Sequence, residues 1–364
     1  MTPVQLISRN PIVRKIADGD AKDDILQMVV GRQLPLTEEE YLESLVFVMK
    51  HEMFKLQALE CLKELTDSTK LSYVERRDGN PRVSYYILLE SLNAHQTAII
   101  GKIIQNQTIP PEFLIKIAEK ADTAILEMLL ENQIKLIAYP EIMEAMEKNP
   151  TITNFILGRI HEIRTFYLSK ENAAEIPLEA VIDDLKETML LDGEKKNGEE
   201  GEENDSESES DEEEDMDIAL VIEKKAKSLI QEINNMSISE RIKLALGGTK
   251  TQRMVLIKDS NKMVSLAVIE SPKISIDEIS ILSKNKSLPS EIIAKISINR
   301  EWTKNYPIML ELVQNPKTPI KSALSFIKQL HIQDLRQVTV NRNINPVIRS
   351  LAINFYSQKT GTKK

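Results

Sequence analysis

The histidines and the single cysteine are the residues of this chain best suited to metal binding or nucleophilic catalysis, and their spacing favours neither. No two histidines have the i, i+4 spacing that places two ligands on one helix face, so we interpret all four as isolated surface or core residues: His51, His95, His161 and His331. Cys61 follows the helical apolar pattern of its neighbours, which favours a small buried side chain over a nucleophile. One cysteine excludes an intrachain disulfide and a multi-cysteine zinc site, and it suits a reducing, cytoplasmic compartment.

The glycine-rich stretch Gly247-Gly248-Thr249-Lys250 is the nearest approach to a nucleotide-binding loop. It lacks the G-x-x-x-x-G-K-[ST] spacing and no strand precedes it, so it predicts a helix C-terminus followed by a turn. No nucleophile elbow or dinucleotide motif is present either. We therefore expect no catalytic, cofactor-binding or metal-binding residues, and a protein that is not an enzyme. A helical-repeat enzyme of the base-excision or lyase type is the weakest alternative, because only fold analogy would support it.

A partner-binding site is suggested around the only tryptophan. Arg300, Trp302, Lys304 and Tyr306 lie close together in the sequence, and tryptophan, tyrosine and arginine are the residue types that dominate the energy of protein interfaces. The alternative is that Trp302 completes the local core.

Further cations follow in the C-terminal part of the chain. A basic surface for acidic protein or phosphate is one interpretation of them, and a solvated surface that balances acidic residues elsewhere is the other. The candidate residues for such a surface are Arg336, Arg342 and Arg349, with Lys328, Lys359, Lys363 and Lys364.

The charge of the chain divides it into three parts. The 364 residues have a net charge of −9, but residues 194–217 contain fourteen acidic residues and two lysines. Such a segment cannot bury apolar surface, which predicts a disordered linker. The flanking parts differ in sign, since residues 1–193 carry 21 basic and 31 acidic groups and residues 218–364 carry 24 and 11. We expect an N-terminal helical module at 1–192, an acidic linker at 193–217, a basic C-terminal module at 218–358 and a flexible tail at 359–364.

Helical spacing of apolar residues dominates both modules. Hydrophobic residues make up 41% of the chain and aromatic residues only 4%, so the core must be aliphatic. Apolar positions recur every three or four residues over 40–65 and 111–130, which is typical of amphipathic helices with one buried stripe. At the start of the first stretch, Thr37 followed by three glutamates predicts a capped helix N-terminus. No long segment alternates apolar and polar residues, so we predict an all-α fold.

One sequence frame recurs at the expected ends of helices. It consists of Asn or Ser, two variable residues, an aliphatic residue or Thr, and then Pro, Ser, Thr or Asn. We expect the first residue to close a helix in the left-handed conformation, the aliphatic residue to pack as a staple, and the last to cap or begin the next helix. Copies begin at Asn80, Asn106, Asn149, Ser271, Asn285, Asn315 and Asn341, with a looser one at Asn10. Such repetition predicts helical hairpins stacked into an α-solenoid.

Parts of the sequence resemble a family of uncharacterised bacterial helical-repeat proteins. The resemblance is carried by residues 299–306 (NREWTKNY), 312–319 (LVQNPKTP), 334–336 (DLR) and 341–343 (NRN), and by residues 34–42 (LPLTEEEYL) as an opening helix. These repeats are similar to HEAT repeats and leucine-rich-repeat variants. The resemblance covers roughly residues 30–355 without the linker, and it implies a fold but no reaction or ligand.

Two functions from different classes remain in view. An α-solenoid without catalytic motifs favours a protein–protein interaction scaffold or adaptor, with a protein partner and no cofactor. The basic C-terminal module favours the alternative, which is binding of nucleic acid or another polyanion, modulated by the acidic linker. Aromatic residues that could stack on bases are sparse, and no DNA-binding motif appears. No stretch of about 18 apolar residues exists, so we expect no membrane contact.

Overall fold

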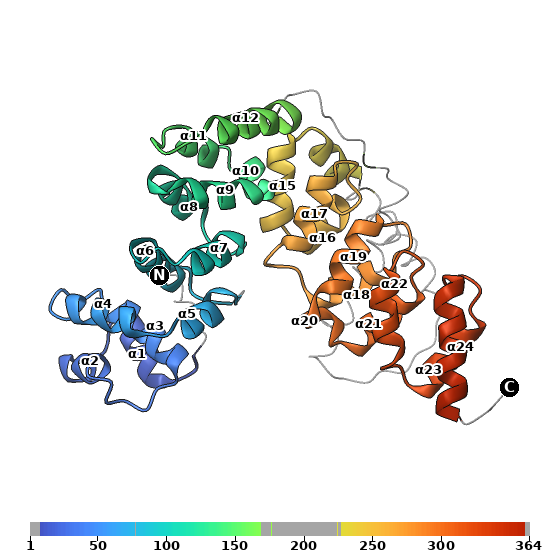
Figure 1. Ribbon diagram of the computed structural model, residues 1–364, viewed down its shortest axis with the longest axis horizontal. Coiled ribbons are helices and arrows are strands. Elements are labelled where there is room, and N and C mark those ends of the chain that lie inside the picture. Colours follow the sequence, from blue (N-terminus) through green and yellow to red (C-terminus); the bar gives the residue numbers. More distant parts are fainter. Residues whose placement is uncertain (1–7, 77, 169–175, 177–223, 225–226, 361–364) are drawn as a thin grey trace, which may run out of the picture. The chain divides into compact units, whose positions relative to one another are not determined.

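The computed structural model describes residues 8–76, 78–168, 176, 224 and 227–360, and every regular element in these ranges is a helix (Figure 1). The prediction of an all-α fold is thereby confirmed. The predicted acidic linker at 193–217, and Lys363 and Lys364 of the predicted tail, lie outside the described residues. Among the described helices, none combines the length and the apolar character that crossing a membrane requires.

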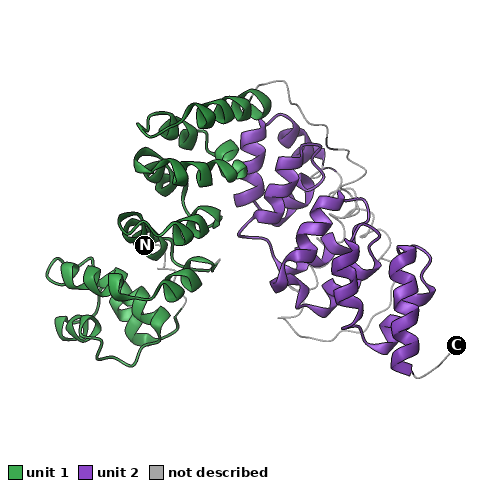
Figure 2. Cartoon of the chain, in the orientation of Figure 1, with its two compact units in different colours: residues 1–169 green, residues 170–364 purple. Residues whose placement is uncertain are grey.

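The chain divides into two compact units, residues 1–169 and 170–364 (Figure 2). The helices of unit 1 are α1 (Pro11–Asp18), α2 (Asp23–Val30), α3 (Glu38–Val48), α4 (Lys55–Glu64), α5 (Asp67–Val74), α6 (Pro81–Asn93), α7 (Thr97–Gln105), α8 (Pro111–Lys120), α9 (Thr123–Glu131), α10 (Gln133–Ala138), α11 (Glu141–Glu147), α12 (Asn154–Ile163) and the π-helix η1 (Arg164–Leu168).

The helices described in unit 2 are short as well, apart from the last one. Residues 227–234 are helical. The helices that follow are α15 (Ile238–Gly247), α16 (Lys250–Leu256), α17 (Lys262–Glu270), α18 (Ile276–Lys284), α19 (Ser290–Ile298), α20 (Arg300–Thr303), α21 (Tyr306–Gln314), α22 (Ile320–Ile327), α23 (Ile332–Val340) and α24 (Pro346–Thr360).

Within each unit, the main packing contacts join helices that are one to three places apart along the chain. Examples are α8 with α11 in unit 1, and α15 with α17 and α23 with α24 in unit 2. The buried side chains are mostly Ile, Leu, Val and Ala, as the composition predicts. Each helix therefore buries its apolar stripe against near neighbours in the sequence.

The two long periodic stretches are each divided into two helices. Residues 40–65 form most of α3 and all of α4, because the chain turns between Met49 and Phe54, and this turn leaves Met53 and Leu56 largely exposed. Residues 111–130 form α8 and most of α9, which begins beyond an N-cap at Asp122. The predicted helices and their buried stripes are present, and these turns interrupt the apolar pattern. Thr37 caps α3 as predicted, in a reciprocal capping box with Glu40.

The frame residues lie between helices, as the sequence predicts, but their backbone conformation differs from the prediction. Asn106, Asn285, Asn315 and Asn341 all have φ between −83° and −72° and ψ between 112° and 119°, which is extended backbone. The expectation of a left-handed closing residue is therefore wrong. The side chains explain the difference, because the amide oxygen of each frame asparagine accepts the main-chain N–H two residues later, a bond that extended backbone permits. At Asn10 and Asn80 this N–H belongs to the first turn of the following helix, so these two residues are its N-caps.

Candidate functional site

The joints between helices carry a repeated set of hydrogen bonds to the previous joint. The Asn315 amide donates to the main-chain oxygens of Ser283 and Asn285, at 2.9 and 3.2 Å, while its own oxygen accepts the N–H of Lys317. Asn106 makes the equivalent bonds to the end of α5, at the main-chain oxygens of Val74 and Arg76. Each of these asparagines thus satisfies C-terminal carbonyls of a helix about 30 residues earlier.

The same role recurs with other residues. Asn149 donates to the oxygens of Ala118 and Ala121 near the end of α8, and Ser271 Oγ donates to Leu246 O at the end of α15. At these four copies of the frame, the first residue therefore ties its joint to an earlier one.

Two lysines form further hydrogen bonds between joints. Lys317 Nζ donates to Ser287 O and Leu288 O of the previous joint, and Lys273 Nζ donates to Gly247 O at 2.6 Å. Both lysines stand two residues after the joint's first residue, in Asn-Pro-Lys and Ser-Pro-Lys. This sequence signal was available, although its meaning is apparent only from the structure.

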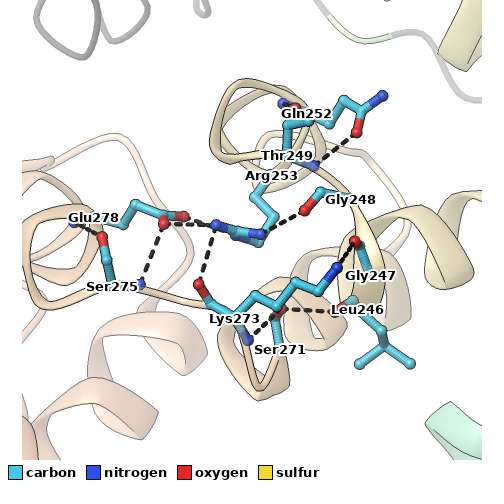
Figure 3. A network of polar contacts seen from close by, with 10 residues as sticks. All are labelled: Leu246, Gly247, Gly248, Thr249, Gln252, Arg253, Ser271, Lys273, Ser275 and Glu278. Carbon is cyan, nitrogen blue, oxygen red and sulfur yellow. Dashed lines mark hydrogen bonds and ion pairs between the residues drawn. The ribbon is translucent and has the colours of Figure 1, made fainter. Parts of the chain in front are cut away.

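Arg253 is the centre of the polar network in Figure 3, at one joint of unit 2. Its Nε and Nη2 donate to the two carboxylate oxygens of Glu278 at 2.8 and 2.7 Å, and Nη1 and Nη2 donate to Gly248 O and Lys273 O. Both charged side chains are almost fully buried. Glu278 also forms a capping box with Ser275 at the start of α18. The network therefore connects α16, α18 and two joints.

The Gly247–Lys250 stretch has the predicted structure. α15 ends at Gly247, Gly248 follows as its C-cap, and Thr249 is the N-cap of α16. The two glycine carbonyls accept bonds from Lys273 and Arg253, so they serve the internal network of Figure 3. The Thr249 N–H is occupied by the Gln252 side chain. The stretch is a joint, and it has no geometry for cradling a phosphate.

The structure places the predicted partner-binding residues on five different segments of unit 2. Arg300, Trp302 and Lys304 belong to α20 and its C-cap, and Tyr306 begins α21. Trp302 is only 6% exposed, so its indole lies in the core and the alternative interpretation of this residue fits its burial. Arg300 and Lys304 are exposed on either side of it.

The remaining predicted residues follow in α23 and α24. Arg336 is exposed on α23, Arg342 is exposed in the joint after it, and Arg349 is half-buried near the start of α24. None of these three arginines forms an ion pair with another described residue. The structure thus brings their helices together, since α23 packs on α24, but it does not join the arginines themselves in a hydrogen-bonded cluster.

Tyr306 has an internal role. Its hydroxyl donates to Asp334 Oδ2 at 2.5 Å and accepts the N–H of His331 at 3.0 Å, and its ring lies against the His331 ring. Partial burial and the Asp334 carboxylate raise the pKa of the phenol. Because His331 is the N-cap of α23, Tyr306 holds the N-termini of α21 and α23 side by side.

The other chemically interesting side chains are dispersed. The four histidines are exposed or half-buried on separate segments, and no group of three metal-ligating residues occurs in the described ranges. Cys61 is half-buried and its thiol donates to Val30 O at 3.4 Å, which fits a packed side chain.

Sequence reasoning missed the buried charges. Arg241 and Asp259 form an ion pair at 2.7 Å with no exposed side-chain surface, and Lys70 pairs with Glu90 at 2.9 Å. Glu43, also buried, accepts bonds from Tyr73 Oη and from the Ser8 N–H.

Two cavities are lined by described residues of unit 1. A cavity of about 610 Å³ lies beside α12 and η1, where Arg159 pairs with Glu162 and Thr165 Oγ1 donates to the His161 carbonyl, so the hydroxyl does not meet a base. A second, of about 560 Å³, lies between α4 and α6 and is lined largely by apolar atoms.

No family profile, no curated protein and no solved structure matches this chain.

Proposed function

We propose that this protein is a non-enzymatic scaffold or adaptor for protein–protein interaction, and that each unit is an α-solenoid of HEAT-like helical hairpins. The proposal is supported above all by the repeated joints, in which one residue caps the carbonyls of a helix about 30 residues earlier. A register of this kind is what stacking of equivalent hairpins requires. It also supports membership of the bacterial HEAT-like and leucine-rich-repeat-variant group, and the single cysteine supports a cytoplasmic location.

The stacked hairpins offer extended surfaces, which suits binding of another protein over several repeats. The experiment is photo-crosslinking of the full chain in its native cells. A crosslinking amino acid is placed at exposed Val340 of unit 2 in one variant and at exposed Glu60 of unit 1 in another, with a variant crosslinking from buried Trp302 as the matched control. We expect a reproducible protein adduct from at least one exposed position and none from the buried one. No adduct from any exposed position would contradict the proposal.

Polyanion binding by the basic part of unit 2 is the second candidate. Residues 286–360 contain 11 basic and 4 acidic groups, and within the described ranges the following cations form no ion pair: Arg300, Lys304, Lys321, Lys328, Arg336, Arg342 and Arg349. Deleting residues 194–217 removes 12 net negative charges and should strengthen binding of DNA or RNA as salt falls. If the chain without residues 194–217 binds neither DNA nor RNA at about 0.05 M salt, this candidate function is refuted.

A further inference from the structure

We propose that one edge of unit 2 binds an acidic peptide segment that also carries aliphatic side chains. The edge, which we call the joint edge, comprises the joints at 257–261, 285–289, 315–319 and 341–345 with the helix ends beside them. This inference rests on the proposed scaffold function and names the chemistry of the partner.

Hydrogen bonds align the first three joints. Lys258 Nζ donates to Ser287 Oγ at 3.1 Å, and Asn315 and Lys317 donate to the main-chain oxygens of Asn285, Ser287 and Leu288. These bonds join 257–261 to 285–289 and then 285–289 to 315–319.

The fourth joint is placed by the packing of the helices around it. Tyr306 ties the N-terminus of α21 to that of α23, and Lys359 of α24 donates to Lys328 O and Leu330 O just beyond the end of α22. α21 also packs on α23, and α22 packs on α24. Helices that are in contact and joined at equivalent ends lie side by side, so we place the joints 315–319 and 341–345, at their other ends, on the same edge.

The charge of the joint edge is not balanced internally. Lys286, Lys321 and Arg342 are exposed there and form no ion pair among the described residues. Lys321 stands in the first turn of α22, where the helix dipole disfavours a cation, and neither α22 nor α24 has an acidic residue in its first turn. The fold thus gains little from these cations, and an acidic partner would complement them.

The same edge exposes aliphatic side chains. Ile320 begins α22, Val340 ends α23 and Val347 is in the first turn of α24, and they are 43%, 73% and 49% exposed. A partner that only neutralised charge would leave these groups in water.

Aromatic surface is scarce in the described part of unit 2. None of the exposed large hydrophobic residues there is aromatic, Trp302 and Phe326 are buried, and Tyr306, Phe355 and Tyr356 are half-buried. Single-stranded nucleic acid draws much of its affinity from base stacking on aromatic side chains. The mixture of unpaired cations and aliphatic groups therefore fits an acidic peptide with Ile, Leu or Val better than it fits a nucleic acid.

Residues 194–217 of this chain share only half of that chemistry. They contain fourteen acidic residues, but Met216 is their only large apolar residue. They should compete for the cations without filling the aliphatic positions, so the full chain carries an electrostatic competitor of the proposed partner.

The test measures fluorescence anisotropy with the full chain and three short labelled probes of equal charge: a peptide of Glu with Ile and Val, a peptide of Glu with Ser, and single-stranded DNA. A second full-length form, with the acids of 194–217 changed to Gln and Asn, removes the competitor. We expect the Glu-Ile-Val peptide to bind most tightly to both forms, and more tightly to the second, with affinity falling as salt rises from about 0.05 to 0.15 M.

Paired substitutions separate the two contributions. Lys321→Glu with Arg342→Glu should weaken both peptides roughly tenfold, since rim charges that are reversed repel an acidic partner. Val340→Ser with Val347→Ser should weaken only the aliphatic peptide, roughly fivefold. The matched control is Lys63→Glu with Lys120→Glu, two exposed lysines of unit 1 that form no ion pair with any residue the structure describes, and it should change affinity less than about twofold.

Several results would overturn the inference. Absence of peptide binding by either form at about 0.05 M salt would do so, as would equal binding of the two peptides or equal effects of the edge and control substitutions. Tighter binding of the DNA would assign the edge to nucleic acid instead. If the peptide fails while crosslinking from Val340 or Glu60 still captures a partner, only this inference falls and the scaffold function stands.

Discussion

Replacing Arg253 with methionine should severely destabilise unit 2. The substitution removes four charge-assisted hydrogen bonds and leaves the Glu278 carboxylate buried without its cation, together with the uncapped carbonyls of Gly248 and Lys273. Breaking one side of a buried ion pair costs about 3–5 kcal/mol. For a unit of this size the urea dependence is about 2 kcal/mol per M, so the urea midpoint should fall by about 2 M. Trp302 is the only tryptophan and is buried in unit 2, which makes its fluorescence a direct readout of this transition.

The double variant decides whether buried charge is the cause. Arg253→Met with Glu278→Gln has no uncompensated carboxylate, while the glutamine oxygen can still accept from the N–H of Ser275, so this variant should be more stable than Arg253→Met alone. Lys262→Met is the matched control, because its pair with Glu291 is 63% and 52% exposed, and it should cost less than about 0.5 kcal/mol. A midpoint shift below about 0.5 M for Arg253→Met, or a double variant less stable than that single variant, would refute the reasoning.

Three further predictions test other parts of the structure. Gly248→Ala should destabilise unit 2 by about 1–3 kcal/mol in Trp fluorescence, because a Cβ there would lie 2.5 Å from a backbone oxygen, whereas Gly247→Ala meets no atom within 4 Å and should be neutral or stabilising; equal effects would contradict this. Asn315→Ala should cost about 2–3 kcal/mol through its two bonds to the previous joint, and Asn341→Ala, which loses only a local bond, about 1 kcal/mol or less. The backbone bond of its capping box lowers the pKa of Glu40, so its stabilisation is present at neutral pH and is lost as pH falls below 4.5; Glu40→Gln should flatten that acid limb in circular dichroism, and an unchanged pH profile would count against it.

The helical architecture and its joints were predictable from local patterns. Apolar spacing identified the helices, and the frame located the joints, because helix ends must satisfy their free carbonyls with a limited set of residues. The conformation of the frame asparagines was not predictable in the same way. Several of them bond residues about 30 positions earlier, as Asn315 bonds Ser283, and such a partner is defined only once the helices have packed.

The buried ion pairs were missed for the same reason. Arg253 and Glu278 are 25 residues apart, and Arg241 and Asp259 are 18 apart, so neither pair has the i, i+3 or i, i+4 spacing that marks an ion pair within one helix. In a sequence, such charges resemble solvated surface residues. Trp302 is the opposite case, a residue that the sequence suggested was exposed and that is buried. Its flanking cations suggested an exposed anchor for a partner, but the indole packs in the core.

Polar side chains near the joints of unit 2 fall into two groups. Some form hydrogen bonds that maintain the fold, and others form none among the described residues and are available to contact a partner. At the joints, side chains such as Asn315, Lys317 and Arg253 satisfy carbonyls of neighbouring joints, so the backbone polar groups that they contact are already paired. Lys321 and Arg342 lie beside these joints and take no part in such bonds. Substituting the first group should therefore shift the unfolding midpoint, whereas substituting the second should change binding and leave the midpoint in place. If the proposed scaffold function holds, such a surface could change its partner without loss of stability, because its contact residues form none of the bonds that maintain the fold.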